Sequence, residues 1–439
     1  SGFGAPFGKQ ENLPWSVAQR LGATPGRLLY GPVGGNTSQM LVNLFFEQIA
    51  QGVHEVVLLA SCEPIRSQSR AMKAGLALDW AEAAPAPPET LAEKTRYASP
   101  HEMAHGIALP VNIYPLFENA LCAHYGRDPV AHRRAIGALM ARFSGIAAAN
   151  PYAQLPVART AEEIISPQGD NRYIGYPYTK YLNANMFVDQ AAALLLMSTA
   201  AADRLGVPQE KRVYLHGSAD THEKILLSER VNYWSSPAIR VGAREALASA
   251  GATVADIAHM DLYSCFPSAV EIAADEIGLA HDDPRGLTLT GGLPYFGGPG
   301  NAYSMHGIAE VAARCRASPG SRGLVFANGG YLTKHSFGVW STGPRDFHRA
   351  DPAGYQAEID AMESPPFTET PAGGGVIETF TVVHDKGEPA FAILVGRQAD
   401  GVRFLAQLHE NPGALIDVPA IGRPVTVAAG APVNLARLA

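Results

Sequence analysis

The side chains best suited to take part in a chemical reaction are one cysteine thiol and two histidine imidazoles in the second half of the chain. Cys265 stands just before residues 267–277, which have the apolar spacing of a helix, and a helix N-terminus lowers the pKa of a nearby thiol. His306 and His335 each follow a glycine-rich turn, and an imidazole can exchange protons near neutral pH. Nucleophilic or acid–base chemistry is one interpretation of this trio. The other is that Cys265 is a small core residue and that both histidines are structural.

The spacing of metal-binding residue types does not indicate a metal site. The cysteines show no Cys-x-x-Cys pair and no Cys/His ligand spacing. They are Cys62, Cys122, Cys265 and Cys315. His101 and His105 have the i,i+4 spacing that could hold zinc on one helix face, but no Glu-x-x-His motif accompanies them. We therefore expect no metal, no permanently bound cofactor, and reduced thiols, as in a cytoplasmic protein.

The composition excludes several classes of function. The chain has 439 residues, of which 47% are hydrophobic, enough for two or three domains with a large core. Its net charge of -7 argues against a nucleic-acid-binding protein, because phosphate binding needs clustered lysine and arginine. No apolar run reaches the roughly 18 residues of a membrane span, so no membrane association is expected. The first residues, SGFGAP, are typical of a loop and do not indicate a signal peptide.

The elements that would position these side chains begin with a β–turn–α–β unit. A short strand at 28–30 leads into the turn GGNT at 34–37, and apolar residues at helical spacing predict a helix over 38–51. The asparagine or the threonine of the turn could cap that helix. The continuous apolar run at 56–60 predicts a strand buried on both faces. Such a unit is typical of a layered α/β fold.

The rest of the chain suggests two similar halves followed by a different domain. Within a first half over 1–198, residues 63–178 form a long excursion with helical segments, either a cap inserted over a site or a plain helical elaboration. The β–turn–α–β pattern recurs over 199–343 and predicts the second half. Residues 344–371, rich in Pro, Glu and Asp, predict a linker. Alternating segments without a helix pattern over 372–439 predict a small all-β domain, a partly open barrel.

Several motifs, in the correct order, resemble those of the thiolase superfamily. The run GGLPYFGGPGN at 291–301 resembles the thiolase loop GGxxxxGHPxG, and DLYSCF at 261–266 resembles the segment that contains HDCF. ANGG at 327–330 resembles CxGG, and 177–190 resembles the PYTKxxxANxxxDQ stretch of the sterol-carrier-type subgroup. With the added C-terminal domain, the chain is similar to the family called thiolase-like protein type 1.

The resemblance implies an architecture. It is an α/β thiolase fold, with two similar βαβαβ halves in α-β-α-β-α layers, followed by a small OB-like β domain. Thiolase halves begin with a strand, a helix and a strand before the nucleophile loop, and the residues before Gly34 do not supply them. We therefore expect that an N-terminal piece is missing or that the first half is built differently.

The departures from the thiolase pattern remove its mechanism. The position of the nucleophilic cysteine falls at about Gly35. Tyr263 and Ser264 replace the His and Asp of HDCF, Gly298 replaces the His of GHP, and Ala327 replaces the last cysteine. Claisen chemistry on thioesters needs a low-pKa thiolate, a base and oxyanion donors. Normal thiolysis is therefore not expected, although members of the family are commonly labelled acetyl-CoA acetyltransferases by similarity.

The resemblance also places a candidate site. The candidate catalytic residues are Tyr263, Cys265, His306 and His335. Binding of CoA or an acyl-CoA is expected at the glycine loops and the side chains beside them. These are Gly34, Gly35, Asn301, Gly329, Gly330 and Lys334. Each has a structural alternative: the tyrosine could fill the site, the asparagine could be a cap, and the lysine could face solvent.

Three functions remain open. The first is an enzyme that acts on CoA thioesters by other chemistry, such as retro-aldol cleavage of a β-hydroxyacyl-CoA, which needs only a base and an oxyanion site. Some thiolase-like aldolases lack the nucleophile and work with a small β-barrel partner. The second is a non-catalytic acyl-CoA-binding or scaffold protein. The third is binding of a partner protein or single-stranded nucleic acid by the C-terminal domain, and its lack of basic excess opposes nucleic acid. A monomer and a homodimer are both compatible with the resemblance.

Overall fold

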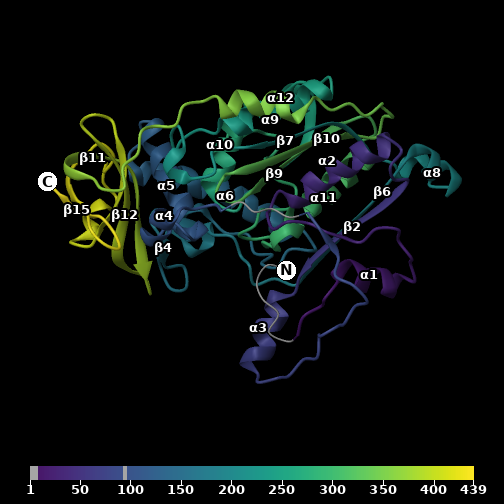
Figure 1. The fold of residues 1–439 in the computed structure, drawn as a ribbon, viewed down its shortest axis with the longest axis horizontal. Helices are drawn as coiled ribbons and strands as arrows, with labels where there is room; N and C mark the ends of the chain where they lie inside the picture. Colours follow the sequence, from purple (N-terminus) through teal and green to yellow (C-terminus); the bar gives the residue numbers. More distant parts are fainter. Residues whose placement is uncertain (1–7, 92–95) are drawn as a thin grey trace.

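The computed structural model describes residues 8–91 and 96–439. Figure 1 shows two joined parts, a layered α/β body and, at the yellow C-terminal end, a small all-β domain. The centre of the body is a layer of two helices, α2 (Thr37–Ala50) and α11 (Tyr303–Ala317). They pack between two sheets, which is the layered arrangement that the sequence predicts.

The two sheets differ in size. The first is an antiparallel pair, β2 (Val56–Glu63) with β6 (Gln190–Met197). The second has the strand order β7-β10-β9-β8, in which β8 and β9 are parallel and the other pairs antiparallel. Its strands are β7 (Tyr214–His222), β8 (Ile257–Leu262), β9 (Arg322–Gly329) and β10 (Lys334–Ser341). On its outer side, α9 (Pro237–Ser249) packs on β7 and β10, and α10 (Pro267–Ile277) packs beside α9.

Strand β2 is buried on one face instead of two. Leu59 is only 7% exposed and belongs to the core around α2 and α11. On the opposite face, Val56 and Leu58 are each 44% exposed and Leu195 of β6 is 60% exposed. The prediction of a strand buried on both faces is therefore wrong within the described residues, because this small sheet packs on the central helices alone.

Local sequence rules explain why α10 begins just after the candidate site. Pro267 occupies the first turn, where a missing backbone N–H costs nothing, and Gly278 ends the helix in the left-handed conformation with φ 86°. The helix therefore begins immediately after Cys265 and Phe266, and β8 ends at Leu262. Tyr263 and Cys265 lie on the short connection between these two rigid elements.

Most of the regular secondary structure described in the excursion at 63–178 is helical. Its two long helices are α5 (Pro110–His124) and α6 (Pro129–Ala149), and α5 packs against both α10 and the C-terminal domain. Its shorter elements are α3 (Ile65–Lys73), β3 (Glu89–Thr90), α4 (Pro100–Ala104), α7 (Ala161–Ile165) and β4 (Tyr173–Gly175). Elsewhere lie α1 (Leu13–Leu21), β1 (Leu29–Tyr30), β5 (Tyr178–Thr179) and α8 (Thr199–Arg204). No helix in the described ranges has both the length and the apolar character to cross a membrane.

The C-terminal domain is a five-stranded barrel, which confirms the predicted OB-like β domain, but the barrel is closed and not partly open as expected. The strands pair in the order β11-β12-β13-β15-β14, and β11 pairs with both β12 and β14 to close the ring. They are β11 (Ala372–Asp385), β12 (Glu388–Gln398), β13 (Arg403–Leu408), β14 (Pro424–Ala428) and β15 (Leu435–Leu438). The region expected as a linker, 344–371, contains helix α12 (Pro352–Asp360), which packs on α9 and β7.

One buried cation, Arg403, joins the barrel to the α/β body. Its side chain is fully buried and pairs with Glu378 at 2.6 Å. One of its terminal nitrogens donates to the carbonyl oxygens of Ser228 (2.9 Å) and Arg230 (2.5 Å), and its guanidinium lies 4.8 Å from the ring centroid of Tyr233. Every donor group of the guanidinium therefore faces a partner, and these partners belong to both parts of the molecule.

We expect Arg403→Met to lower the free energy of unfolding by about 3 kcal/mol, because it leaves two buried carbonyl oxygens unpaired and removes one cation from Glu378. The control is Arg437→Met, since Arg437 is 80% exposed and lies 3.9 Å from Glu410. That change is expected to cost less than about 0.5 kcal/mol. Urea unfolding followed by circular dichroism measures both, and equal effects would contradict the anchoring role of Arg403.

Candidate functional site

The space beside Gly35, the residue that the thiolase resemblance aligns with the nucleophile, is filled by a neighbouring side chain. A Cβ atom built on Gly35 would overlap the hydroxyl oxygen of Tyr263 and the carbonyl oxygen of Asn328. These contacts are closer than van der Waals packing allows, so no side chain fits at residue 35 while Tyr263 keeps its place. The tyrosine that stands where thiolases have the histidine of HDCF thus also occupies the space of the nucleophile.

The environment of Tyr263 keeps its phenol protonated. The residue is 7% exposed and packs edge-on against Tyr303, with 5.2 Å between ring centroids. Burial raises the pKa of the Tyr263 phenol above its ordinary value. Its hydroxyl makes no hydrogen bond within the described part of the chain. A buried phenol with a raised pKa is a poor general base, so this geometry favours the structural alternative, in which Tyr263 fills the site.

Cys265 is not an activated thiol in this structure. It is 7% exposed, and burial raises the pKa of its thiol to about 12, which leaves almost no thiolate at neutral pH. The side-chain nitrogen of Asn328 lies 3.8 Å from its sulfur. Its place before α10 had suggested a lowered pKa, but loss of hydration outweighs the effect of the helix end.

A tyrosine from the insertion closes the site from the other side. Tyr114 of α5 stacks on Phe266 with 4.4 Å between ring centroids. Its hydroxyl accepts from Asn328 Nδ2 (2.9 Å) and from the backbone N–H of Leu332 (3.2 Å), and donates to the carbonyl of Gly330 (3.3 Å). Part of the insertion therefore acts as a cap over the glycine turn. Sequence motifs could not identify Tyr114, because it lies outside every thiolase-like segment.

Asn301 holds the first glycine loop by hydrogen bonds within the protein. Its Oδ1 accepts from the Gly34 N–H (2.8 Å), and its Nδ2 donates to the Pro32 carbonyl (2.7 Å). Ser304 donates to the Gly35 carbonyl at 2.8 Å. Lys334 Nζ donates to the carbonyl of Val33 at 3.3 Å. The Gly34 N–H, a candidate oxyanion donor, is therefore already satisfied, and Lys334 folds onto the loop.

At the other glycines of the candidate site, the backbone lies close to neighbouring residues or has a conformation that favours glycine. A side chain on Gly329 would overlap Asn36 Oδ1, and Gly330 has a left-handed φ of 69°. Asn36 precedes α2 but makes no capping bond; its Nδ2 donates to Ser336 Oγ at 3.2 Å. A Cβ on Gly298 would lie 3.2 Å from the carbonyl oxygen of Asn185. The space beside Gly298 is thus bounded by this carbonyl and by the side chains of Leu293 and Ala184.

The two candidate histidines do not form a catalytic group with Tyr263. His335 is fully buried, its ring stacks on Phe326 at 5.6 Å, and both ring nitrogens lack a partner in the described ranges. Burial holds the pKa of His335 well below its usual range. His306 packs on Phe296 at 5.1 Å, and burial lowers its pKa to about 4. No hydrogen bond among the described residues joins either ring to Tyr263.

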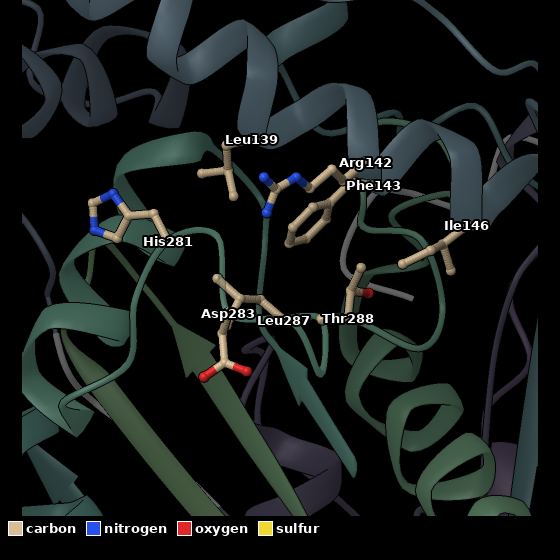
Figure 2. Close-up of a pocket in the computed structure, with 9 residues that line it drawn as sticks. Leu139, Arg142, Phe143, Ile146, His281, Asp283, Leu287 and Thr288 are labelled. Carbon is tan, nitrogen blue, oxygen red and sulfur yellow. The ribbon is translucent and has the colours of Figure 1, made fainter. Parts of the chain in front are cut away.

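Two hollows lie away from this packed site. Figure 2 shows residues that line a cavity beneath α6, among them Leu139 and Phe143 of that helix, His281 and Leu287. The volume of this cavity is about 30 Å³. A larger groove of about 300 Å³ lies between α5 and the barrel. It is lined by Ala120, Ala123, His124, Tyr233, Trp234 and Ile421, among others. Neither hollow is lined by Gly35, Tyr263 or Cys265.

Comparisons with known proteins agree on the fold. Residues 355–430 match the family model described as the thiolase-like protein type 1 additional C-terminal domain. A monomeric SCP2-thiolase-like protein type 1 from Mycobacterium smegmatis is 40% identical with a TM-score of 0.86, and the match covers 98% of this chain and 87% of that one. No curated protein sequence matches.

More distant structures are also similar. The Ltp2-ChsH2(DUF35) aldolase has a TM-score of 0.52 at 20% identity, covering 72% of this chain and 79% of that one. The dimeric peroxisomal thiolase of Saccharomyces cerevisiae has a TM-score of 0.47 at 14% identity, covering 70% of this chain and 74% of that one. At 20% sequence identity, the match to the aldolase supports only a shared fold.

We expect Gly35→Ala to destabilise the protein by about 1–3 kcal/mol, because its methyl group would be forced against Tyr263 and the Asn328 carbonyl. The control is Gly145→Ala in α6, where a Cβ would meet nothing within 4 Å, and a neutral or stabilising effect is expected. In a Tyr263→Ala background the penalty of Gly35→Ala should shrink. Thermal unfolding of the four combinations measures this coupling, and strictly additive effects would contradict the proposed overlap.

Thiol reactivity tests the state of Cys265. Cys62 is exposed, whereas Cys122, Cys265 and Cys315 are buried. With a colorimetric disulfide reagent at pH 8, we expect one thiol to react rapidly in the native protein and Cys62→Ser to abolish that phase. The buried thiols should react only in denaturant. A second rapid thiol that disappears in Cys265→Ser would mean that Cys265 is accessible and activated.

Proposed function

Since the chain belongs to the SCP2-thiolase-like protein type 1 family, we propose that it binds an acyl-CoA or a related acyl thioester without thiolysis or Claisen condensation. By the same relationship we propose that it is a monomer, the state named for the relative from M. smegmatis. The observation that carries the proposal is the Tyr263 phenol in the space of the nucleophile, beside a glycine that cannot accept a side chain.

The chemistry of thiolysis supports this assignment. The acyl group must be held on a thiolate, and a base must move a proton at the carbon next to the carbonyl. Gly35 has no side chain, and the Cys265 thiol has a pKa of about 12. Each candidate imidazole packs against an aromatic ring, His306 against Phe296 and His335 against Phe326. Cys265 is therefore a thiol at neutral pH, and burial makes both imidazoles weak bases.

The groove between α5 and the barrel is where we propose that the ligand binds. Ala120, Ala123 and Ile421 give it an apolar lining suited to an acyl chain. Trp234 is 39% exposed there and stacks face to face on His124, with 3.8 Å between ring centroids. This position lies outside the filled nucleophile site, so binding there does not require Tyr263 or Tyr114 to move.

Calorimetry with CoA, acetoacetyl-CoA and a medium-chain acyl-CoA tests the proposal, with thiolysis measured in the same samples. We expect binding of the acyl thioesters and no thiolysis above background. Ala123→Trp, which fills the groove, should weaken binding at least tenfold, whereas Lys334→Ala should leave it nearly unchanged. The reverse pattern would place the ligand at the glycine loops. No binding of any thioester would refute the proposal, and thiolysis would refute its non-catalytic part.

Retro-aldol cleavage is a second candidate, supported by one observation. The fold is similar to that of an aldolase, and the chain carries its own β-barrel. Carbon–carbon cleavage of a β-hydroxyacyl thioester needs no nucleophile, so the loss of cysteine at residue 35 does not oppose it. Release of a carbonyl product from any of a panel of β-hydroxyacyl-CoA esters would establish this activity. If none of the esters is cleaved, binding remains the proposed function.

A further inference from the structure

Three buried side chains from three helices meet away from the thiolase-like site. Glu118 of α5, His132 of α6 and Glu271 of α10 are 0%, 2% and 1% exposed. One ligand atom from each lies within 4.8 Å of the other two. The sequence offered no sign of this group, because its members share no local motif. They become neighbours only when the insertion packs on α10.

The contacts within this cluster leave one carboxylate oxygen unsatisfied. Glu118 Oε1 is 2.6 Å from His132 Nε2, and Glu118 Oε2 accepts from the Tyr178 hydroxyl at 2.5 Å. Glu271 Oε1 faces His281 Nδ1 at 3.6 Å. Glu271 Oε2 is buried and has no hydrogen-bond partner in the described part of the chain. The two carboxyl groups themselves lie within hydrogen-bonding reach of each other.

Such an arrangement requires a compensating positive charge. Two carboxylates withdrawn from water repel each other in a medium of low dielectric, and each is costly unless paired. The donor set, two carboxylate oxygens and one imidazole nitrogen, is typical of zinc and related divalent metals.

We propose that Glu118, His132 and Glu271 bind one divalent transition-metal ion of the zinc class. Its two charges would neutralise the two carboxylates and give Glu271 Oε2 a partner. His281, which is 23% exposed, or a water molecule could complete the coordination. The ion would tie α5 and α6 to α10, the helix that begins directly after Cys265 and Phe266. This inference is independent of thioester binding.

The surrounding charges define how pH should affect the site. Arg127 Nη1 lies 3.4 Å from His132 Nδ1, so without metal Nδ1 accepts and Nε2 carries the proton donated to Glu118. A metal ion at Nε2 must displace this proton to solvent, so affinity should fall as the pH falls. On the outer side, His281 Nε2 pairs with Asp275 at 2.8 Å, and Tyr125 donates to Asp275 at 2.6 Å.

The test uses the full chain, unfolded in denaturant with a chelator and refolded with no metal, with Zn²⁺ or with Co²⁺. Refolding is needed because the ligands are enclosed. Metal content is measured by mass spectrometry after gel filtration, Co²⁺ ligation by visible absorption, and stability by thermal unfolding. We expect about one ion per chain, a Co²⁺ absorption band, and a higher midpoint temperature with Zn²⁺.

Two variants make the assignment specific. Glu271→Gln keeps the size of the side chain and removes its charge, and we expect it to lose the bound ion and the Zn²⁺-dependent rise in midpoint temperature. Glu210→Gln, at an exposed carboxylate, should bind as the parent chain does. If the parent chain retains no Zn²⁺ and its midpoint is the same with and without the metal, the proposal is overturned, and the three groups share a proton instead. This last comparison needs no variant to fold.

Discussion

The contact between the Tyr263 phenol and the backbone of Gly35 is the constraint on which the candidate site depends. Each residue requires the other: the phenol can lie there only because residue 35 has no Cβ, and a Cβ cannot be added while the phenol remains. The loss of the nucleophile is therefore not a single substitution that one reverse change would restore. It is a change of packing that involves β8, the glycine loop and the turn after β9.

Other polar groups around this contact serve the packing. Asn301 binds the loop that carries Gly35, Asn328 joins the turn to Tyr114, and Tyr114 brings α5 over both. The Gly34 N–H, which could stabilise an anion in an enzyme, is occupied by Asn301 here. The body is in turn joined to the barrel through α5 and Arg403. A thiolase framework has thus become a closed core, and open space remains where the added parts meet it.

The sequence predicted the fold better than the site, for a physical reason. Glycine-rich turns and the alternation of apolar and polar residues along strands are local signals in the sequence. The layered body and the barrel could therefore be predicted from them. The strand at 56–60 was predicted correctly, but its burial on both faces was not, because an apolar run does not show how many faces are covered. Tyr114, Arg403 and the cluster of Glu118, His132 and Glu271 could not be found, since each acts through partners far away in the chain. The burial of the side chains at 263 and 265, which decides their chemistry, is a property of packing that the sequence does not show.

The most direct test of the account is alkylation of a cysteine placed at residue 35. In a Cys62→Ser background, the rate of reaction with iodoacetamide is compared between Gly35→Cys and the double variant Gly35→Cys/Tyr263→Ala. Removing the phenol relieves the overlap with Tyr263 and leaves that with the Asn328 carbonyl, so we predict faster labelling of residue 35 in the folded double variant than in the single variant. A stable, folded Gly35→Cys single variant that is labelled equally fast would contradict the account, because the nucleophile position would then be open with Tyr263 in place.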